Sequence, residues 1–300
     1  MRSAKTGEIA DSVGVEGAYP QPVSFGCLVG REEERVMRNG GRPPDTIVLI
    51  HGPWLTPRSW EGWAERYNRR GYHVRVPAWP GMEGEVEALN ADPSPIAQLT
   101  VDRVVNHYEW VVLGLDRPPL IVGHSFGGTV TQVLLDRGLG AAGLGMASAT
   151  VLAVGDLGRL PGREVVALHS AAFHDAFANT MSRQDSDAIH ARYHVPAPRA
   201  MLRRDAFANV CSDAPSGRDP RREPRAPLLL ASFGEDRLVR PPAVRPDQED
   251  DEITAMLTFP GRPHYPAAPG WEEVADRVLD WLLEHAGVAG RPGPASTTLH

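Results

Sequence analysis

Residues 120–130, LIVGHSFGGTV, place one serine between glycines where an apolar run gives way to a helical pattern. Gly123, Ser125 and Gly127 fit G-x-S-x-G, in which a sharp strand-to-helix turn exposes the serine hydroxyl above a sheet. The glycines omit side chains that would clash in such a turn. The next backbone N–H, that of Phe126, would face a developing oxyanion at a helix N-terminus. We predict that Ser125 is a nucleophile and Phe126 an oxyanion donor; the alternative is an ordinary serine in a glycine-rich turn.

A serine hydroxyl is a weak nucleophile at neutral pH, so it needs a base, and the base needs a group that orients it. In this kind of turn the acid and then the histidine follow the serine along the chain. Asp236 lies just beyond the apolar run 227–232, and His264 lies a few residues beyond the run 253–259. We predict that His264 is the general base and then the general acid, and that Asp236 orients its imidazole.

Other residues compete for these roles. Glu235 and Asp251 are the nearest alternatives to Asp236 as the acid. His190 and His194 are four residues apart and could share a metal ion, but no cysteine or clear third ligand is near them in the sequence. We therefore predict no metal site, and no motif indicates a nucleotide, flavin or other cofactor.

The elements that must position these side chains alternate between strands and helices. Six apolar runs predict strands, at 46–50, 73–78, 119–123, 142–147, 227–232 and 253–259. Helical spacing appears in 57–70, in 95–115, directly after Ser125 and from Trp271 onward. Alternation of this kind, with Val/Ile/Leu-rich strands, predicts an α/β fold with a mostly parallel, doubly wound sheet. The carboxyl edge of such a sheet is where ligands bind.

The chain divides by composition into a core and three other segments. We predict an N-terminal arm, partly disordered, over 1–44 and a tail over 287–300. The core comprises 45–149 and 226–286. Between its halves, 150–225 breaks the rhythm, has no convincing strand and is rich in Ala, Arg, Asp, Phe and His. We predict that it forms a mostly helical lid over the carboxyl edge of the sheet.

Charge and composition limit the partners. The 300 residues carry a formal net charge of -7, which argues against nucleic acid or an anionic membrane as the main partner. The two cysteines are far apart and suggest neither a disulfide framework nor a zinc site. No apolar stretch fits a secretory signal or a membrane span. We expect a cytoplasmic protein that acts on a small molecule; the sequence does not indicate an oligomeric state.

Five segments together resemble the α/β-hydrolase superfamily, and most closely its small cofactor-free serine hydrolases common in actinobacteria. The segments are HGPWLTPRSWEGW, GHSFGG, PLLLASFGEDRLV, FPGRPHY and PGWEEVADRVLDWL, and the resemblance covers about residues 45–286. It implies the α/β-hydrolase fold with a helical lid insertion. It also implies a serine hydrolase that cleaves an ester, lactone, thioester or related acyl group through an acyl-enzyme on Ser125.

One departure from the family bears on the reaction. The family's second oxyanion donor is the backbone N–H that follows His-Gly, and here that residue is Pro53, which has no N–H. Trp54, through its backbone or indole N–H, is the substitute that we expect. The alternative is a non-hydrolytic biosynthetic enzyme of the same fold, such as a cyclase, lyase or acyl transferase. A binding module is a third hypothesis, which the complete order Ser125, Asp236, His264 disfavours.

Several side chains are candidates for contact with substrate. They are His51, Trp54, His124, Phe173, Phe177, Met181, Tyr193 and Phe207. The alternative is that the aromatic residues of 150–225 form the core of the lid and that His51 and His124 have structural or gating roles. A second departure lies between Val239 and Ile253, where prolines and acids replace the family's helix.

Overall fold

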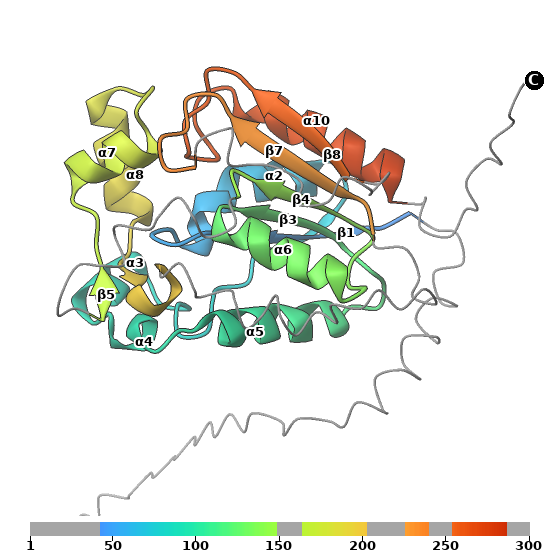
Figure 1. The fold of residues 1–300 in the computed structure, drawn as a ribbon, viewed down its shortest axis with the longest axis horizontal. Helices are drawn as coiled ribbons and strands as arrows, with labels where there is room; N and C mark the ends of the chain where they lie inside the picture. The colour runs from blue at the N-terminus through green and yellow to red at the C-terminus, as the bar shows by residue number, and fades with distance from the viewer. Residues whose placement is uncertain (1–42, 149–163, 203–225, 240–253, 287–300) are drawn as a thin grey trace, which may run out of the picture. The chain divides into compact units, whose positions relative to one another are not determined.

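The fold was examined in a computed structural model, which describes residues 43–148, 164–202, 226–239 and 254–286. Its main sheet has six strands in the order β2-β1-β3-β4-β7-β8, and every neighbouring pair is parallel. The strands are β1 (Thr46–Ile50), β2 (His73–Arg75), β3 (Leu120–His124), β4 (Ala142–Met146), β7 (Leu228–Phe233) and β8 (Thr254–Phe259). The predicted fold class is confirmed (Figure 1). The predicted tail and nearly all of the predicted arm lie outside the described residues.

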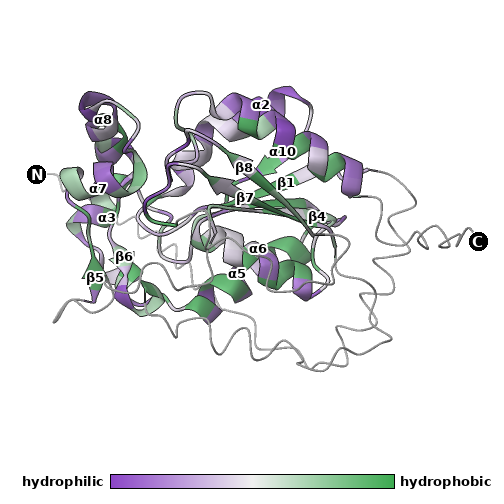
Figure 2. Cartoon of the chain, turned by 45° about the horizontal axis from the view of Figure 1, so that its top comes forward, coloured by the Kyte–Doolittle hydropathy of each residue, from purple (hydrophilic) through white to green (hydrophobic). Residues whose placement is uncertain are grey.

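Successive residues of the central strands serve opposite faces of the sheet. In β1, Ile47 and Leu49 pack in one buried cluster, whereas Val48 and Ile50 pack in another. The first cluster contains residues of helices α2 (Glu61–Arg69) and α10 (Trp271–His285), and the second contains residues of α5 (Val101–Leu113) and α6 (Phe126–Asp136). The central strands are therefore apolar on both faces. Figure 2 colours the strands of the sheet mainly as hydrophobic.

The helix predictions need two corrections. The segment 95–115 is not one helix: α4 (Ser94–Ala97) ends before Thr100, whose hydroxyl caps the N-terminus of α5 by accepting from the Arg103 N–H. A side chain that can cap favours a new helix start over continuation. The segment 57–70 begins as a 3-10 turn, η1 (Pro57–Trp60), before α2. A further helix, α3 (Val86–Ala91), was not predicted.

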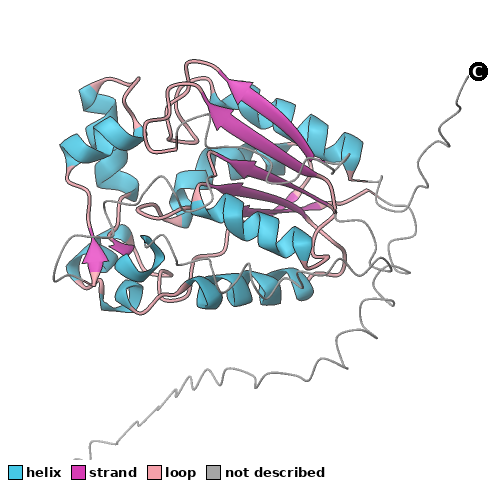
Figure 3. Ribbon diagram, viewed as in Figure 1, coloured by secondary structure: helices cyan, strands magenta, loops and turns pink. Residues whose placement is uncertain are grey.

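Part of the chain between β4 and β7 forms a separate set of elements beyond the carboxyl ends of the strands (Figure 3). We call residues 164–202 the inserted segment. It contains β5 (Val165–Val166), α7 (Ser170–Phe177), α8 (Arg183–Tyr193), β6 (Ala197–Pro198) and the 3-10 turn η3 (Arg199–Leu202). The expectation of no strand here was wrong, because β5 and β6 pair antiparallel over two residues each. Pairing this short leaves no periodic pattern in a sequence.

Each strand prediction is correct in place: the bounds of 46–50 match those of β1, and the bounds of the other five differ. The predicted strand 73–78 is short, and only His73–Arg75 pair with β1. Three of the prolines and glycines near its end, Pro77, Pro80 and Gly81, belong to the loop that follows.

Among the helices that the structure describes, none combines the length and the apolar character that a membrane span requires.

Candidate active site

Ser125 occupies a sharp turn between β3 and α6. Its backbone has φ 55° and ψ -121°, and its N–H donates to the Met146 carbonyl at 2.8 Å. A Cβ on Gly123 would lie 2.0 Å from the Gly127 carbonyl oxygen, and a Cβ on Gly127 would lie 2.3 Å from that of Ile50. Real Cβ atoms do not come so close, so both glycines are required by the backbone that surrounds the serine. The side chain of Ser125 is partly exposed at this point.

His264 and Asp236 are hydrogen-bonded to each other in the interior. The Nδ1–H of His264 donates to Asp236 Oδ2 at 2.7 Å, and both side chains are fully buried. The other carboxylate oxygen accepts from the backbone N–H groups of Leu238 and Val239, at 2.8 and 2.7 Å. The carboxylate therefore has donors at both oxygens, which fixes its orientation. The rival Glu235 is exposed, and Asp251 lies outside the described residues.

The Nε2 atom of His264 is the acceptor that a general base requires. Because the Nδ1–H is the donor of the hydrogen bond to Asp236, the Nε2 atom of the neutral ring carries a lone pair. This atom is buried and has no hydrogen-bond partner among the residues that the structure describes. Other buried side-chain atoms, such as His51 Nε2 and Trp60 Nε1, also lack a partner there, so the bond of the same ring to Asp236 is what marks His264 as the candidate base.

The loop that follows β8 meets the end of β3. His124, which directly precedes Ser125, donates from Nε2 to the His264 carbonyl oxygen at 2.9 Å, and the two rings are 4.6 Å apart. The sequence alone predicts that the carboxyl ends of parallel strands share one edge, and this contact brings His264 next to the serine turn.

The loop after β1 is held by the inserted segment. Trp54 has φ 64°, its indole N–H donates to the Val166 carbonyl at 2.9 Å, and its own carbonyl accepts from the Val195 N–H at 3.1 Å. The indole N–H is therefore already paired within the protein. No sequence pattern indicates these contacts, because their partners lie more than a hundred residues away.

Two buried histidines flank the site and are neutral. His51 donates from Nδ1 to the Gly52 carbonyl at 3.0 Å and stacks on Trp79 at 4.7 Å. Burial lowers the pKa of His51 to about 4. Burial, and then the nearby His264, lowers the pKa of His124 well below its usual value. Neither ring carries a positive charge at neutral pH, and both are 0% exposed.

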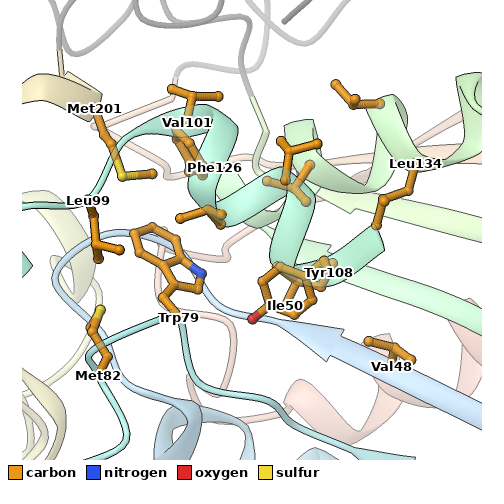
Figure 4. Packing of buried hydrophobic residues seen from close by; sticks show 14 of the residues in the cluster. Val48, Ile50, Trp79, Met82, Leu99, Val101, Tyr108, Phe126, Leu134 and Met201 are labelled. Carbon is orange, nitrogen blue, oxygen red and sulfur yellow. The ribbon is translucent and has the colours of Figure 1, made fainter. Parts of the chain in front are cut away.

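The aromatic side chains of Phe126, directly after the serine, and Trp79, in the loop after β2, pack together. Phe126 lies against Trp79 with ring centroids 5.3 Å apart, in the cluster drawn in Figure 4. Met82, Leu99 and Met201 are other members of this cluster. This cluster packs against the first turn of α6 and therefore supports the backbone that follows Ser125.

The predicted substrate contacts in the inserted segment are mostly packed. Phe173, Phe177 and Tyr193 belong to one buried cluster with Trp54, and Met181 is partly buried against it. Their burial favours the alternative stated from the sequence, that they form the core of this segment. Phe207 lies outside the described residues.

The histidine pair of α8 has protein partners. His190 donates from Nε2 to the Leu168 carbonyl at 2.8 Å, and His194 accepts from the Leu168 N–H through Nε2 at 3.1 Å. Burial, with His190 nearby, lowers the pKa of His194 to about 3. Within the described ranges, no group of three or more His, Cys, Asp or Glu could hold a metal ion.

Known structures share this fold. An extracellular alpha/beta-hydrolase from a Paenibacillus species covers 83% of this chain and 100% of its own, at 19% identity and TM-score 0.59. A monoacylglycerol lipase of Paleococcus ferrophilus covers 81% and 96%, at 17% identity and TM-score 0.58. Tomato Methylketone Synthase I, in complex with 2-tridecanone, covers 81% and 99%, at 10% identity and TM-score 0.56.

A search of curated protein sequences gave no significant match. The family model described as "Alpha/beta hydrolase family" matches residues 47–277, which is well over half of the chain. The match to the family model, the parallel sheet and the glycine-flanked serine turn all indicate the same family. The chain belongs to the alpha/beta hydrolase family.

Proposed function

We propose that this protein is a serine hydrolase that cleaves an ester, lactone, thioester or related acyl group of a small molecule through an acyl-enzyme on Ser125. The observation that carries the proposal is the buried His264 Nε2, unpartnered among the described residues, with Nδ1 bonded to Asp236. Its ring touches that of His124, the residue before the strained serine. A base, its orienting acid and an exposed hydroxyl thus lie at one edge of the sheet, as acyl transfer requires.

The reaction has two half-steps. The Ser125 Oγ attacks the acyl carbon while its proton passes to His264 Nε2, and the same proton then leaves with the alcohol or thiol group. Water attacks the acyl-enzyme and gives a proton to Nε2, which returns it to the Ser125 Oγ as the bond from Oγ to the acyl carbon breaks and the free acid leaves. Asp236 stays ionised throughout and stabilises the imidazolium.

Two backbone donors would stabilise the oxyanion. Phe126 begins α6, so its N–H lies at the positive end of a helix dipole, directly after the nucleophile. Trp54 supplies the second donor through its backbone N–H, because Pro53 has none and the indole is bonded to Val166.

Labelling with a fluorophosphonate, read by intact-protein mass, tests the proposal. We expect one adduct per chain in the wild type and none in Ser125→Ala. In Asp236→Asn we expect labelling slowed by roughly 10³-fold or more, since the imidazole would lose its correct tautomer. An adduct that persists in Ser125→Ala, or no adduct in the folded wild type, would refute an activated Ser125.

Pro53 favours a second candidate, a cyclase, lyase or acyl transferase that uses the same residues. Loss of one oxyanion donor costs about 2.7–4 kcal/mol of transition-state stabilisation in enzymes that depend on it. One structural relative, the methylketone synthase, is not named as a hydrolase. A protein that labels on Ser125 but hydrolyses none of a panel of short p-nitrophenyl esters and thioesters would favour this candidate over the first.

A further inference from the structure

Among the described residues, the His264 side chain touches two rings in addition to its bond to Asp236. The His124 ring, from the end of β3, lies 4.6 Å from it, tilted by 57°. The Phe177 ring, from the end of α7, lies 4.8 Å from it at 87°, in an edge-on contact. All three rings are 1% exposed or less.

His124 reaches His264 through the backbone as well. Its Nε2–H donates to the His264 carbonyl at 2.9 Å, which ties the base's own main chain to the strand that carries Ser125. The lowered pKa of His124 keeps this ring neutral, so no second positive charge opposes the proton that His264 takes up. The other groups that act on this pair are Asp236, bonded to Nδ1 of His264, and the neutral His51.

Phe177 reaches His264 through the neighbouring residue. Its carbonyl accepts from the Tyr265 N–H at 2.8 Å, so the last residue of α7 is bonded to the loop that carries the base. Its ring also stacks face to face on Phe173, at 4.8 Å and 4°. At 1% exposure Phe177 is not open to a ligand, and its ring packs against those of His264, Phe173 and Trp54.

A single hydrogen bond to Asp236 fixes one atom of the imidazole but leaves the ring free to tilt about that bond. Tilt moves Nε2, and a displacement of about 1 Å can cost roughly 10²-fold in rate. Contact with the His124 and Phe177 rings limits that tilt, because each of these residues is also hydrogen-bonded to the backbone of residues 264–265.

We propose that His124 and Phe177 are positioning residues that hold His264 in the orientation required for proton transfer. The inserted segment then takes part in base catalysis, in addition to any contact that it makes with substrate. The proposal rests on the proposed role of His264 as the general base, and the test below separates the two.

Paired variants distinguish positioning from packing. Phe177→Leu removes the ring that meets His264, and Phe173→Leu removes the neighbouring buried ring of the same helix, for which the described structure gives no ring contact with His264. His124→Leu removes the donor to His264, whereas His124→Gln keeps an N–H that can reach the carbonyl. Phe177→Met has a similar volume but an unbranched side chain that fills irregular space, and it replaces Phe177→Leu if that variant does not fold.

Two readouts are needed. One is the low-field NMR proton of the His264 Nδ1–H, assigned by its loss in Asp236→Asn and followed as a function of pH without any substrate. The other is the pH profile of the rate of fluorophosphonate labelling at saturating probe. We expect Phe177→Leu and His124→Leu to move or broaden the proton signal, shift the pH profile and slow labelling about tenfold. We expect Phe173→Leu and His124→Gln to remain within about threefold of the wild type, with an unchanged profile.

Two results would overturn the proposal. Equal effects of Phe177→Leu and Phe173→Leu on the proton signal and the pH profile would show that Phe177 only supports the fold. Equal effects of His124→Gln and His124→Leu would show that the bond to the His264 carbonyl is not what holds the ring. If the wild type shows the proton signal but never labels, the proposed function fails, while the NMR comparison still decides whether the two residues position His264.

Discussion

The loops after β1 and after β3 lie at the same sheet edge. They have similar local features, but different contacts hold them in place. Each follows a strand end marked by a buried neutral histidine, His51 or His124. Each also contains a residue other than glycine with positive φ, Trp54 at 64° and Ser125 at 55°. Such backbone is uncommon and concentrates at functional sites.

The serine turn is held by its own glycines and by the sheet. Gly123 and Gly127 let backbone approach backbone, and the Ser125 N–H bonds to the Met146 carbonyl of the adjacent strand. The Trp54 loop is held by the inserted segment, through the Val166 carbonyl and the Val195 N–H. One strained residue therefore depends on neighbouring glycines and the core sheet, and the other on a segment outside that sheet.

The largest effect should come from Gly123→Ala, which breaks the local side of this contrast. The new Cβ would lie 2.0 Å from a backbone oxygen, and backbone cannot move aside as a side-chain tip can. We expect a loss of about 3 kcal/mol or more in the free energy of unfolding, measured by urea denaturation. The control is Gly84→Ala, where the new Cβ would be 3.7 Å from Leu89. Similar stability of the two variants would contradict the steric argument.

Acid should destabilise both loops, through their histidines. The pKa of His51 falls from 6.5 to about 4 on folding, and that of His124 also falls, because burial disfavours the charged ring. The unfolded chain then binds more protons below pH 6.5, so stability is present at neutral pH and lost as the pH falls toward 4. For His51 the difference between the two pKa values corresponds to roughly 3 kcal/mol of the free energy of unfolding.

The measurement is the free energy of unfolding against pH between 7 and about 5, above the range where carboxylates titrate. His51→Gln and His124→Gln should each reduce the slope, by at most about 1.4 kcal/mol per pH unit. A slope unchanged in both variants would mean that neither ring is kept neutral by the fold.

Trp54→Phe tests the distant support of the β1 loop. It removes the indole donor and leaves the buried Val166 carbonyl without that partner, which costs about 1–3 kcal/mol in addition to the lost volume. Trp60→Phe is the matched control, because Trp60 is equally buried but its indole nitrogen has no partner among the described residues. We expect Trp54→Phe to be the less stable of the two in urea, and the opposite order would argue against the role given to this bond.

Pro53→Ala should have the smallest effect, and it addresses the oxyanion site. If Trp54 already supplies the second donor, a new N–H at residue 53 changes the labelling rate by less than about threefold. The control is Pro57→Ala, at the start of η1, which loosens the same loop without placing an N–H beside the serine. A gain of about 10²-fold or more in Pro53→Ala alone would instead mean that the native site lacks a second donor.

The elements that could be predicted from the sequence are those set by local rules. Apolar runs located all six strands of the main sheet, and the glycines around Ser125 located its turn. The order of parallel strands was enough to expect Asp236 and His264 at one edge. In the structure, His264 Nδ1 lies 2.7 Å from Asp236 Oδ2.

Features that depend on distant partners could not be predicted. The break before Thr100 depends on one capping hydroxyl within a continuous apolar pattern. The pairing of β5 with β6 involves two residues per strand. The restraint of Trp54 and the contact of Phe177 with His264 join segments whose proximity only the folded chain creates.

The hydrogen bonds between the inserted segment and the loops after β1 and β8 involve mainly backbone groups of the inserted segment. The acceptors are the carbonyl oxygens of Val166 and Phe177, and one donor is the N–H of Val195. Every amino acid carries a carbonyl, and every one except proline carries an N–H. Side chains of this segment can therefore be replaced without removing the groups that make these bonds, provided that Val195 does not become proline.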